Sequence, residues 1–313
     1  MPVTLVVMNV YDVIIIGSGS AGYTASVYSC RAGRKTLLLA GSIPGGQLMI
    51  TSDVENYPGF PEGILGPELM EKLRKQAERF GPEIVYDDVA NVDFTRRPFT
   101  VTAGKHSYEG KTVIIATGAN AKWLEIPSET RFKGKGVSSC ATCDGFFFKD
   151  KEVIVVGGGD TAMEEASFLA NITRKVTVVH RRDKLRASQI MQDRVVKNPR
   201  IQFAWDSTVR EVLGDRTVTG VRLGNLKTGK ETKLNTDGVF VAIGHEPNTQ
   251  VFKGSVDLDS KGYIVTKDET ETSVPGVFAA GDVRDYKYRQ AITAAADGCK
   301  AAIDADRFLS EHN

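Results

Sequence analysis

The stretch VIIIGSGSAG, residues 13–22, decides the fold class of this 313-residue chain. Its apolar run is typical of a buried parallel strand, and its glycines permit a tight turn into a helix. We expect that helix over residues 21–31, closed by Gly33, and a second strand over residues 35–40. Strand, glycine turn, helix and strand in this order predict the opening of a dinucleotide-binding βαβ unit.

The same order returns in the second half of the chain. Residues 151–156 predict a strand, GGGDTA at 157–162 predicts a glycine turn and a helix, and residues 175–179 predict the next strand. Each half closes on a similar strand, TVIIATG at 112–118 and GVFVAIG at 238–244. Such self-similarity is typical of internal duplication, and two equivalent glycine turns predict two dinucleotide sites.

The order of these segments predicts a discontinuous domain arrangement. A third strand of the same kind at 276–282 leads into a last helix over 290–309, and turn-forming stretches near 119–127 and 245–249 flank the second unit. We therefore expect an α/β protein with two Rossmann-like dinucleotide-binding domains, the second inserted into the first. The expected domains are 1–118 together with 247–313, and 119–246, which contains the only CxxC motif.

Composition excludes several classes of partner. The formal net charge is +1 and charged residues make up 25% of the chain, which leaves no basic footprint for nucleic acid or an anionic membrane. No apolar run is long enough to cross a bilayer, and the first residues lack the basic start of a signal peptide. Four cysteines are too few for a secreted disulfide framework, so we expect a cytoplasmic protein. Met8 is an alternative to Met1 as the start.

Basic residues follow the second strand of the second unit, in the order His180-Arg181-Arg182 and then Lys184 and Arg186. An acidic residue at this place selects the ribose 2′-hydroxyl of NAD, whereas basic residues suit the 2′-phosphate of NADP. The segment therefore favours NADPH over the alternative of a solvated basic turn. The first unit has LAG at 39–41 and no acid there, so its ribose contacts must come from elsewhere.

The motif CATC at 140–143, followed by Asp144, predicts redox chemistry. A zinc site needs four ligands, and the chain has no second cysteine pair and only scattered histidines, so we expect no metal. A single CxxC near βαβ units indicates a dithiol/disulfide couple. Asp144 could move the proton that thiol exchange requires or cap a helix. Cys30 and Cys299 are expected in the core.

Two dinucleotide sites and a dithiol together predict an electron relay. Nicotinamide delivers a hydride, and a flavin accepts it and hands the electron pair to a disulfide. We therefore expect FAD in the first domain and NADPH in the second. Because the nicotinamide site and the CxxC both belong to the inserted domain and both must reach one flavin, we infer that they take turns by a hinge motion about the two linkers.

Motifs along nearly the whole chain, from about Tyr11 to the C-terminus, resemble the low-molecular-weight thioredoxin reductases. They are GSGSAGYTA, GGQL at 45–48, VENYPGFPEG at 54–63, CATCDG at 140–145, GGGDTAMEEA at 157–166, HRRDKLRAS at 180–188, AIGHEPNT at 242–249, AAGDV, and YRQAITAAADGC. The resemblance implies a homodimeric FAD enzyme that uses NADPH to reduce the disulfide of thioredoxin or a thioredoxin-like protein.

The resemblance also implies site residues. The implied FAD contacts are Ser18, Gly19, Ser20, Ala21, Gly22, Gly46, Gln47, Asn56, the backbone of Val89, Thr117, Gly118, Asp282, Arg289, Gln290 and Ala291. The implied NADPH contacts are Gly159, Asp160, Thr161, His180, Arg181, Arg182 and Arg186. Cys143 is implied to be the thiol beside the flavin, with Cys140 as its disulfide partner.

Two departures from the family pattern and three rival functions remain. Ser20 stands where the family usually has proline, and Ile43-Pro44 has no acid where some members have one. A flavin-dependent dithiol oxidase would not need the basic segment, and a ferredoxin-NADP reductase of similar fold would lack the CxxC. A non-enzymatic redox or dinucleotide sensor would bind both cofactors without turnover.

Overall fold

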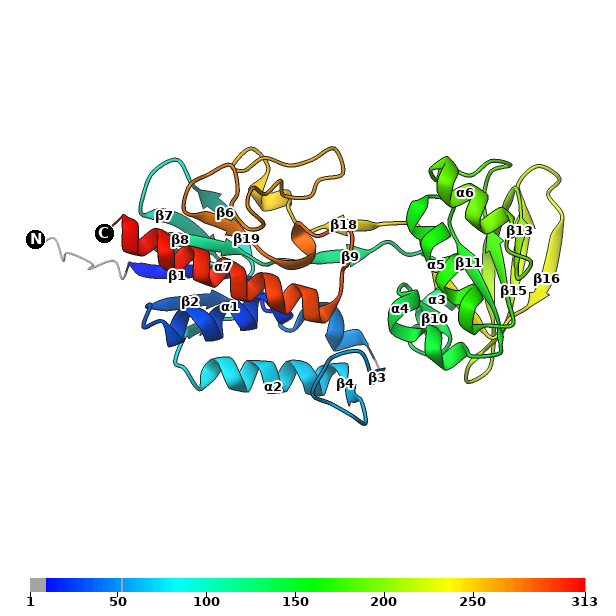
Figure 1. Ribbon diagram of the computed structural model, residues 1–313, viewed down its shortest axis with the longest axis horizontal. Coiled ribbons are helices and arrows are strands. Elements are labelled where there is room, and N and C mark those ends of the chain that lie inside the picture. The colour runs from blue at the N-terminus through cyan, green and yellow to red at the C-terminus, as the bar shows by residue number, and fades with distance from the viewer. Residues whose placement is uncertain (1–9, 52, 313) are drawn as a thin grey trace, which may run out of the picture. The chain divides into compact units, whose positions relative to one another are not determined.

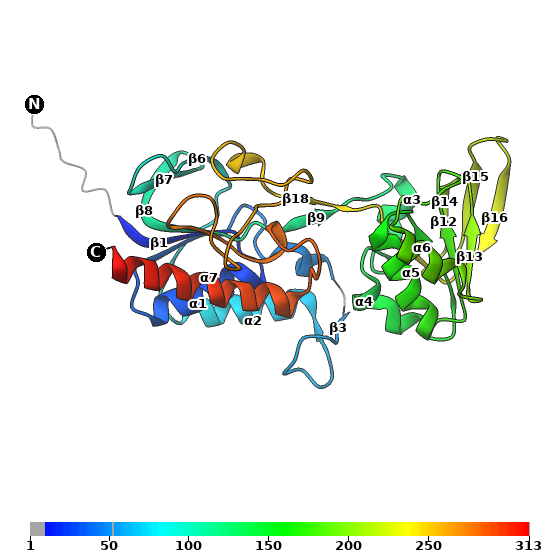
Figure 2. The same cartoon turned by 45° about the horizontal axis from the view of Figure 1, so that its top comes forward.

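The structure is a computed structural model that describes residues 10–51 and 53–312 (Figures 1 and 2). It divides into two compact units, the first formed by Met1–Asn120 with Glu246–Asn313 and the second by Ala121–His245. The alternative start at Met8 lies outside the described residues. No helix of the described residues is long and apolar enough to cross a membrane.

A seven-stranded sheet forms the centre of the first unit. Its strands are β1 (Tyr11–Ile16), β2 (Thr36–Leu39), β5 (Glu83–Val85), β6 (Val89–Asp93), β7 (Phe99–Ala103), β8 (His106–Ile115) and β19 (Val277–Ala279). They follow the order β5-β2-β1-β8-β7-β6, with β19 paired to the second half of β8. The strands β5, β2, β1, β8 and β19 pair in parallel, whereas β6 and β7 pair antiparallel. The predicted βαβ opening is therefore present.

Helices α1 (Ser20–Arg31), α2 (Gly66–Glu78) and α7 (Ala291–Glu311) cover one face of this sheet (Figure 1). Because successive strand residues face opposite sides, Val13 and Ile15 pack against these helices, and Ile14 and Ile16 pack into a second core on the other face. A Cβ atom added at Gly298 of α7 would lie 2.1 Å from the Ala21 carbonyl oxygen. Only glycine therefore permits this close crossing of α1 and α7.

The stretch 41–66, which is rich in glycine, proline and polar residues, contains short regular elements. They are the 3-10 helix η1 (Gly46–Ile50) and the strands β3 (Asp53–Val54) and β4 (Ile64–Leu65). The two strands pair because Val54 and Ile64 are buried with Leu69 of α2 in a small separate core. The strand predicted at 112–118 also differs, since β8 begins at His106, where the β7 hairpin extends it, and ends at Ile115.

The second unit is built around a five-stranded parallel sheet. Its order is β10 (Val137–Ser138), β17 (Gly238–Val241), β11 (Glu152–Val156), β12 (Lys175–Val179) and β13 (Ile201–Ala204). A three-stranded antiparallel sheet comprises β14 (Ser207–Gly214), β15 (Val218–Asn225) and β16 (Glu231–Asn235). The helical elements are α3 (Pro127–Phe132), α4 (Ala141–Asp144), η2 (Gly145–Phe148), α5 (Asp160–Ile172) and α6 (Gln189–Val196).

Two apolar cores sandwich the parallel sheet of the second unit. Val153 and Val155 of β11 pack with α5, while Ile154 and Val156 pack with the antiparallel sheet. Two short strands, β9 (Ala119–Ala121) and β18 (His245–Pro247), pair with each other where the chain passes between the units. These are the segments that the sequence predicted as linker strands. The remaining elements, η3 (Gln250–Phe252) and η4 (Gly281–Val283), belong to the first unit.

Candidate functional site

The first glycine turn joins β1 to α1, and its glycines serve two different steric requirements. A Cβ at Gly17 would lie 2.3 Å from the Ala116 carbonyl oxygen, and a Cβ at Gly22 would lie 1.8 Å from the Gly17 oxygen. At Gly19 a Cβ would meet nothing within 4 Å in the described residues. Gly17 and Gly22 therefore allow the turn to close, and Gly19 leaves open space at the N-terminus of α1. This arrangement fits a pyrophosphate group.

Ser18 braces this turn internally. Its hydroxyl donates to the Ala40 carbonyl oxygen at 2.7 Å and accepts from the Gly45 amide at 3.0 Å. The side chain thus ties the glycine turn to the end of β2 and to the segment that contains Gly46 and Gln47. The Ser18 contact implied for FAD can then come from its backbone.

An acidic side chain reaches the end of β2 from another part of the chain. The Asp88 carboxylate accepts hydrogen bonds from the Ser42 amide at 3.0 Å and the Ser42 hydroxyl at 2.7 Å. The Ser42 hydroxyl is the main cause that lowers the pKa of Asp88. This residue precedes Val89, an expected FAD contact. Sequence analysis missed it, because the link between residues 42 and 88 exists only after β2 and β5 have paired.

Asp282 has the environment expected of a carboxyl group that accepts a hydrogen bond from a bound ligand. Its Oδ1 atom is buried and makes no hydrogen bond within the described residues. Burial, with a smaller contribution from the nearby Asp285, raises the pKa of Asp282 to about 7. A buried acceptor without a partner is costly, so hydroxyl groups of a ribitol or ribose fit here.

Two hydrogen-bonded groups bring together other expected FAD contacts. Gln47 donates to Asn120 at 2.7 Å, Asn120 donates to Asn248 at 3.0 Å, and the Asn248 amide donates to the Thr117 carbonyl at 2.9 Å. Asn120 and Asn248 were not predicted. Their only sequence signal is their place in the linker segments.

The second of these groups lies at the start of α7. The Asn56 side chain donates to the Gln290 side chain at 3.2 Å, although 234 positions separate them in the sequence. Gln290 also forms a capping box with Thr293. Arg289 precedes it with a φ of 49°, a left-handed conformation that is uncommon outside glycine. The neighbouring expected contact Ala291 begins α7, and Val89 begins β6.

The second glycine turn, between β11 and α5, has a histidine ring against it. A Cβ at Gly157 would lie 2.4 Å from the Ala242 oxygen, and a Cβ at Gly158 would lie 2.2 Å from the His180 ring, whereas Gly159 is open. His180 is 4% exposed, its Nε2 atom lies 3.0 Å from the Lys184 oxygen, and its ring meets Trp205 edge-on. Burial lowers the pKa of His180. The neutral ring therefore supports the turn from inside.

The basic segment 180–186 is attached to the same turn. The Arg186 amide donates to the Gly158 oxygen at 2.7 Å, and the Asp160 carboxylate accepts from the Ser188 amide at 2.8 Å. Arg181, Arg182 and Arg186 are exposed, and their guanidinium groups form no ion pair with any described residue. Three uncommitted positive charges beside a glycine turn fit an additional phosphate group.

Cys140 and Cys143 form a disulfide in the second unit. The Cys140 amide donates to the Ser138 hydroxyl at 3.0 Å, and Ala141 between the cysteines is 1% exposed in the unit's core. The disulfide is thus held on a well-anchored segment while both cysteines stay partly exposed. Asp144 occupies the N-cap position of η2 without a side-chain capping bond to that helix.

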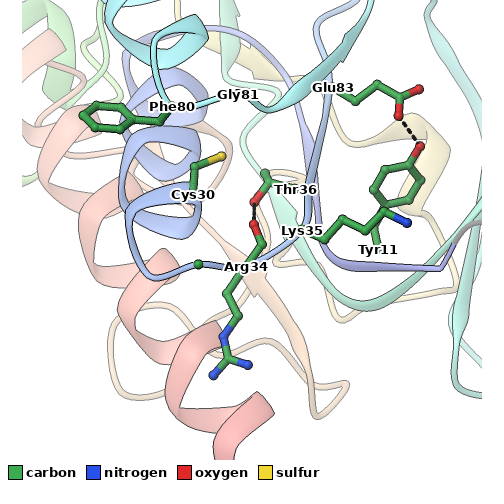
Figure 3. A pocket seen from close by; sticks show the side chains of 9 residues that line it. Tyr11, Cys30, Arg34, Lys35, Thr36, Phe80, Gly81 and Glu83 are labelled. Carbon is green, nitrogen blue, oxygen red and sulfur yellow. Dashed lines mark hydrogen bonds between the residues drawn. The ribbon is translucent and has the colours of Figure 1, made fainter.

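A pocket of about 430 Å³ opens at the amino ends of β1 and β2, whereas the first glycine turn follows the carboxyl end of β1 (Figure 3). Tyr11, which donates to Glu83 at 2.6 Å, and Cys30 line it. None of the expected site residues lines this pocket. Cys30 and Cys299 are half-buried rather than in the core as expected; Cys30 lies in the last turn of α1, which borders the pocket. Within the described residues, no group of three or more metal-ligating side chains comes together.

Two dinucleotide-type folds and one disulfide define a class of protein: oxidoreductases that exchange electrons between a pyridine nucleotide and a disulfide. The chain belongs to the pyridine nucleotide-disulphide oxidoreductase family, whose model matches residues 11–298. The predicted fold class, two dinucleotide-binding domains with one inserted in the other, is confirmed.

Three relatives that match nearly the whole chain are named for one activity. The chain is 53% identical over 305 residues to a thioredoxin reductase of Streptomyces clavuligerus, covering 96% of this chain and 95% of that protein. It is 54% identical to a thioredoxin reductase of Rickettsia felis, covering 96% and 98%. A solved thioredoxin reductase from Giardia duodenalis matches with a TM-score of 0.93 at 45% identity, covering 97% and 100%. The resemblance found in the sequence is confirmed.

Proposed function

We propose that the chain is an NADPH-dependent thioredoxin-disulfide reductase that uses FAD. The observation on which this function rests most is the Cys140–Cys143 disulfide in the same unit as an uncommitted basic segment, in a chain that matches thioredoxin reductases over nearly its whole length. The overall reaction converts NADPH, a proton and the partner's disulfide into NADP⁺ and the partner's dithiol. Bound NADPH supplies a hydride, and bound FAD passes the electron pair to the disulfide.

FAD binding is assigned to the first unit, which is then the FAD-binding domain. The open space at Gly19 supports a pyrophosphate position, and the unpartnered Oδ1 atom of Asp282 supports a hydroxyl contact. The other proposed contacts are Ser18, Ser20, Ala21, Gly22, Gly46, Gln47, Asn56, the Val89 backbone, Thr117, Gly118, Arg289, Gln290 and Ala291. The hydrogen bonds of Gln47 and Asn56 hold two of these side chains in fixed positions.

NADPH binding is assigned to the second unit. Gly159, Asp160 and Thr161 are at the glycine turn, and Arg181, Arg182 and Arg186 supply charge for the 2′-phosphate. His180 is assigned to the same site, and its burial under Gly158 supports a role in holding the turn and the basic segment together.

The dithiol performs the chemistry on the partner protein. Once the Cys140–Cys143 bond has been reduced, one thiolate attacks the partner's disulfide and forms a mixed disulfide, and the other thiolate then displaces the partner's dithiol and restores the bond. Asp144 is proposed to accept or donate the proton that this exchange requires. Cys143 is assigned to the flavin side of the pair.

The proposed partner is thioredoxin or a thioredoxin-like protein, and the proposed form is a cytoplasmic homodimer. The paired linkers β9 and β18 are proposed as the hinge about which the inserted domain moves. A rigid crosslink between the two units should then block steady-state turnover, and unchanged turnover would contradict the hinge.

An anaerobic titration of the purified protein with NADPH tests the function. Loss of flavin absorbance together with two new thiols, mapped to Cys140 and Cys143, is the expected result. Catalytic NADPH consumption with oxidised thioredoxin then separates the reductase from a non-enzymatic sensor. If flavin is present but NADPH yields no thiols, the dithiol oxidase becomes the better reading.

A further inference from the structure

Two carboxylates lie within or beside the basic segment 180–186. Asp183 belongs to the segment itself, and the Asp206 amide donates to the Arg182 carbonyl oxygen at 3.2 Å. Acidic side chains at this end of a βαβ unit accept hydrogen bonds from the ribose hydroxyls of NAD and repel a 2′-phosphate. Their presence opposes the selectivity that the arginines favour.

Lys227, from the turn between β15 and β16, pairs with both carboxylates. Its Nζ atom lies 2.9 Å from Asp183 Oδ2 and 3.1 Å from Asp206 Oδ2. The pKa of Lys227 is raised by these two carboxylates, and the pKa of Asp183 is lowered by Lys227. The three arginines of the segment stay unpaired among the described residues, while this lysine is fully committed to the acids.

The position of Lys227 is fixed by its turn. The Asn225 side chain accepts from the amides of Lys227 at 3.0 Å and Thr228 at 2.9 Å. The Leu226 amide donates to the Asp206 carbonyl oxygen at 2.6 Å. Asp206 itself has a φ of 50°, in the left-handed region that favours glycine. The contact between this turn and the end of β13 is therefore built from several bonds and includes a disfavoured backbone conformation.

We propose that Lys227 is a specificity-determining positioning residue for the nicotinamide dinucleotide. It offsets one of the two negative charges of Asp183 and Asp206, and it occupies one oxygen of each carboxylate that would otherwise accept a ribose hydroxyl of NADH. The basic segment then presents a larger positive charge to the 2′-phosphate of NADPH than its own arginines and lysine would present beside the two carboxylates alone. This inference rests on the proposed function, since it concerns the same dinucleotide site.

The test compares dinucleotide binding with and without the lysine charge. Titration calorimetry of the FAD-loaded protein with NADP⁺ and NAD⁺ is run on the wild type, Lys227→Met, and Lys230→Met as a matched control. Lys230 is on the same turn, is exposed, and forms no ion pair with a described residue. Lys227→Met should weaken NADP⁺ binding about fivefold, the effect of roughly one exposed ionic interaction, and should leave NAD⁺ binding unchanged or make it tighter, because the freed carboxylate oxygens can accept ribose hydroxyls. Lys230→Met should leave both unchanged.

Two further variants separate charge from structure. Lys227→Arg should retain NADP⁺ affinity, and Lys227→Met combined with Asp183→Asn should recover most of the loss. The difference between Lys227→Met and the wild type should also shrink in high salt, because these side chains are exposed. Equal weakening of NADP⁺ and NAD⁺, or no recovery in the double variant, would overturn the proposal.

The wild-type titration distinguishes the two levels of failure. If the wild type binds NADP⁺ no more tightly than NAD⁺, the proposed NADPH dependence itself fails. If the wild type prefers NADP⁺ and Lys227→Met keeps that preference, only the role of Lys227 fails.

Discussion

The two glycine turns have the same spacing but use their second position differently. In the first turn Ser18 reaches the end of β2 through its hydroxyl, which donates to the Ala40 oxygen. In the second turn the equivalent residue is Gly158, because the His180 ring from the end of β12 fills the place of its Cβ. In both units one side chain joins the turn to the second strand. Where the turn itself supplies this side chain, its second position holds serine. Where the second strand supplies it, as His180 does, the second position must be glycine.

The strand ends also differ in charge. The first unit presents apolar residues at the end of β2 and receives a carboxylate from Asp88. The second presents three arginines that pair with no described carboxylate, and Lys227 pairs with the two acids beside them. The two units therefore share the strand, glycine turn and helix but differ in the charge that surrounds the end of the second strand.

The largest expected effect comes from removing one thiol of the CxxC, which should abolish disulfide reduction without affecting dinucleotide binding at either glycine turn. Cys143→Ser should leave FAD bound and still reducible by NADPH, because neither glycine turn is altered, but should abolish thioredoxin reduction. Flavin absorbance and a thioredoxin reduction assay measure the two steps. Retained disulfide reduction would refute the role assigned to Cys143.

The charge difference is tested by Arg181→Gln combined with Arg182→Gln. Charge-assisted hydrogen bonds contribute roughly 1.5 to 3 kcal/mol each, so the KM for NADPH should rise by more than about 100-fold while the KM for NADH changes little. FAD content should stay constant, since the first unit is untouched. An equal loss for both dinucleotides would show that the 2′-phosphate site is elsewhere.

The second position of each glycine turn is tested by one variant, Gly158→Ala in the second unit and Ser18→Ala in the first. Gly158→Ala should weaken NADPH binding by about tenfold, because its Cβ would meet the His180 ring at 2.2 Å, and FAD binding should not change. Adding His180→Ala should make room for the methyl group and recover part of the affinity.

Ser18→Ala should act on the other unit. It removes two hydrogen bonds worth about 1 kcal/mol each, so FAD affinity and unfolding free energy should fall while NADPH binding is kept. Fluorescence titration of the apoprotein with FAD and denaturant unfolding measure these changes. If Gly158→Ala and Ser18→Ala each weaken FAD binding and NADPH binding equally, the two dinucleotide sites are not independent.

The last prediction concerns the pH dependence of stability that Asp282 gives to the apoprotein. Its pKa is about 7 in the folded chain and near 4 when unfolded, so between these values the folded chain holds a proton that the unfolded chain has released. Its contribution to stability is therefore present below about pH 4 and lost as pH rises to about 7. Asp282→Asn should remove this decline in Tm. An unchanged pH dependence would mean that the carboxyl is not protonated in the folded apoprotein.

Local patterns predicted much of the site. The strand, glycine turn and helix of each unit follow from short-range spacing, and the basic segment follows directly on a predicted strand. Asp88, Asn120, Asn248 and Lys227 were missed because their partners lie between 21 and 131 positions away. The strands β3 and β4 likewise could not be predicted, because Val54 and Ile64 pair over a small core that they form with Leu69.

The sequence by itself determined the two βαβ openings, the CxxC and the sign of charge after each second strand, since these depend on neighbouring residues and on steric limits of the backbone. Only the tertiary structure decided that His180 is buried under Gly158, that Asp282 has an unpartnered oxygen, and that Lys227 covers two carboxylates. Burial and charge neutralisation depend on which distant segments meet, and that is set by packing of the whole unit.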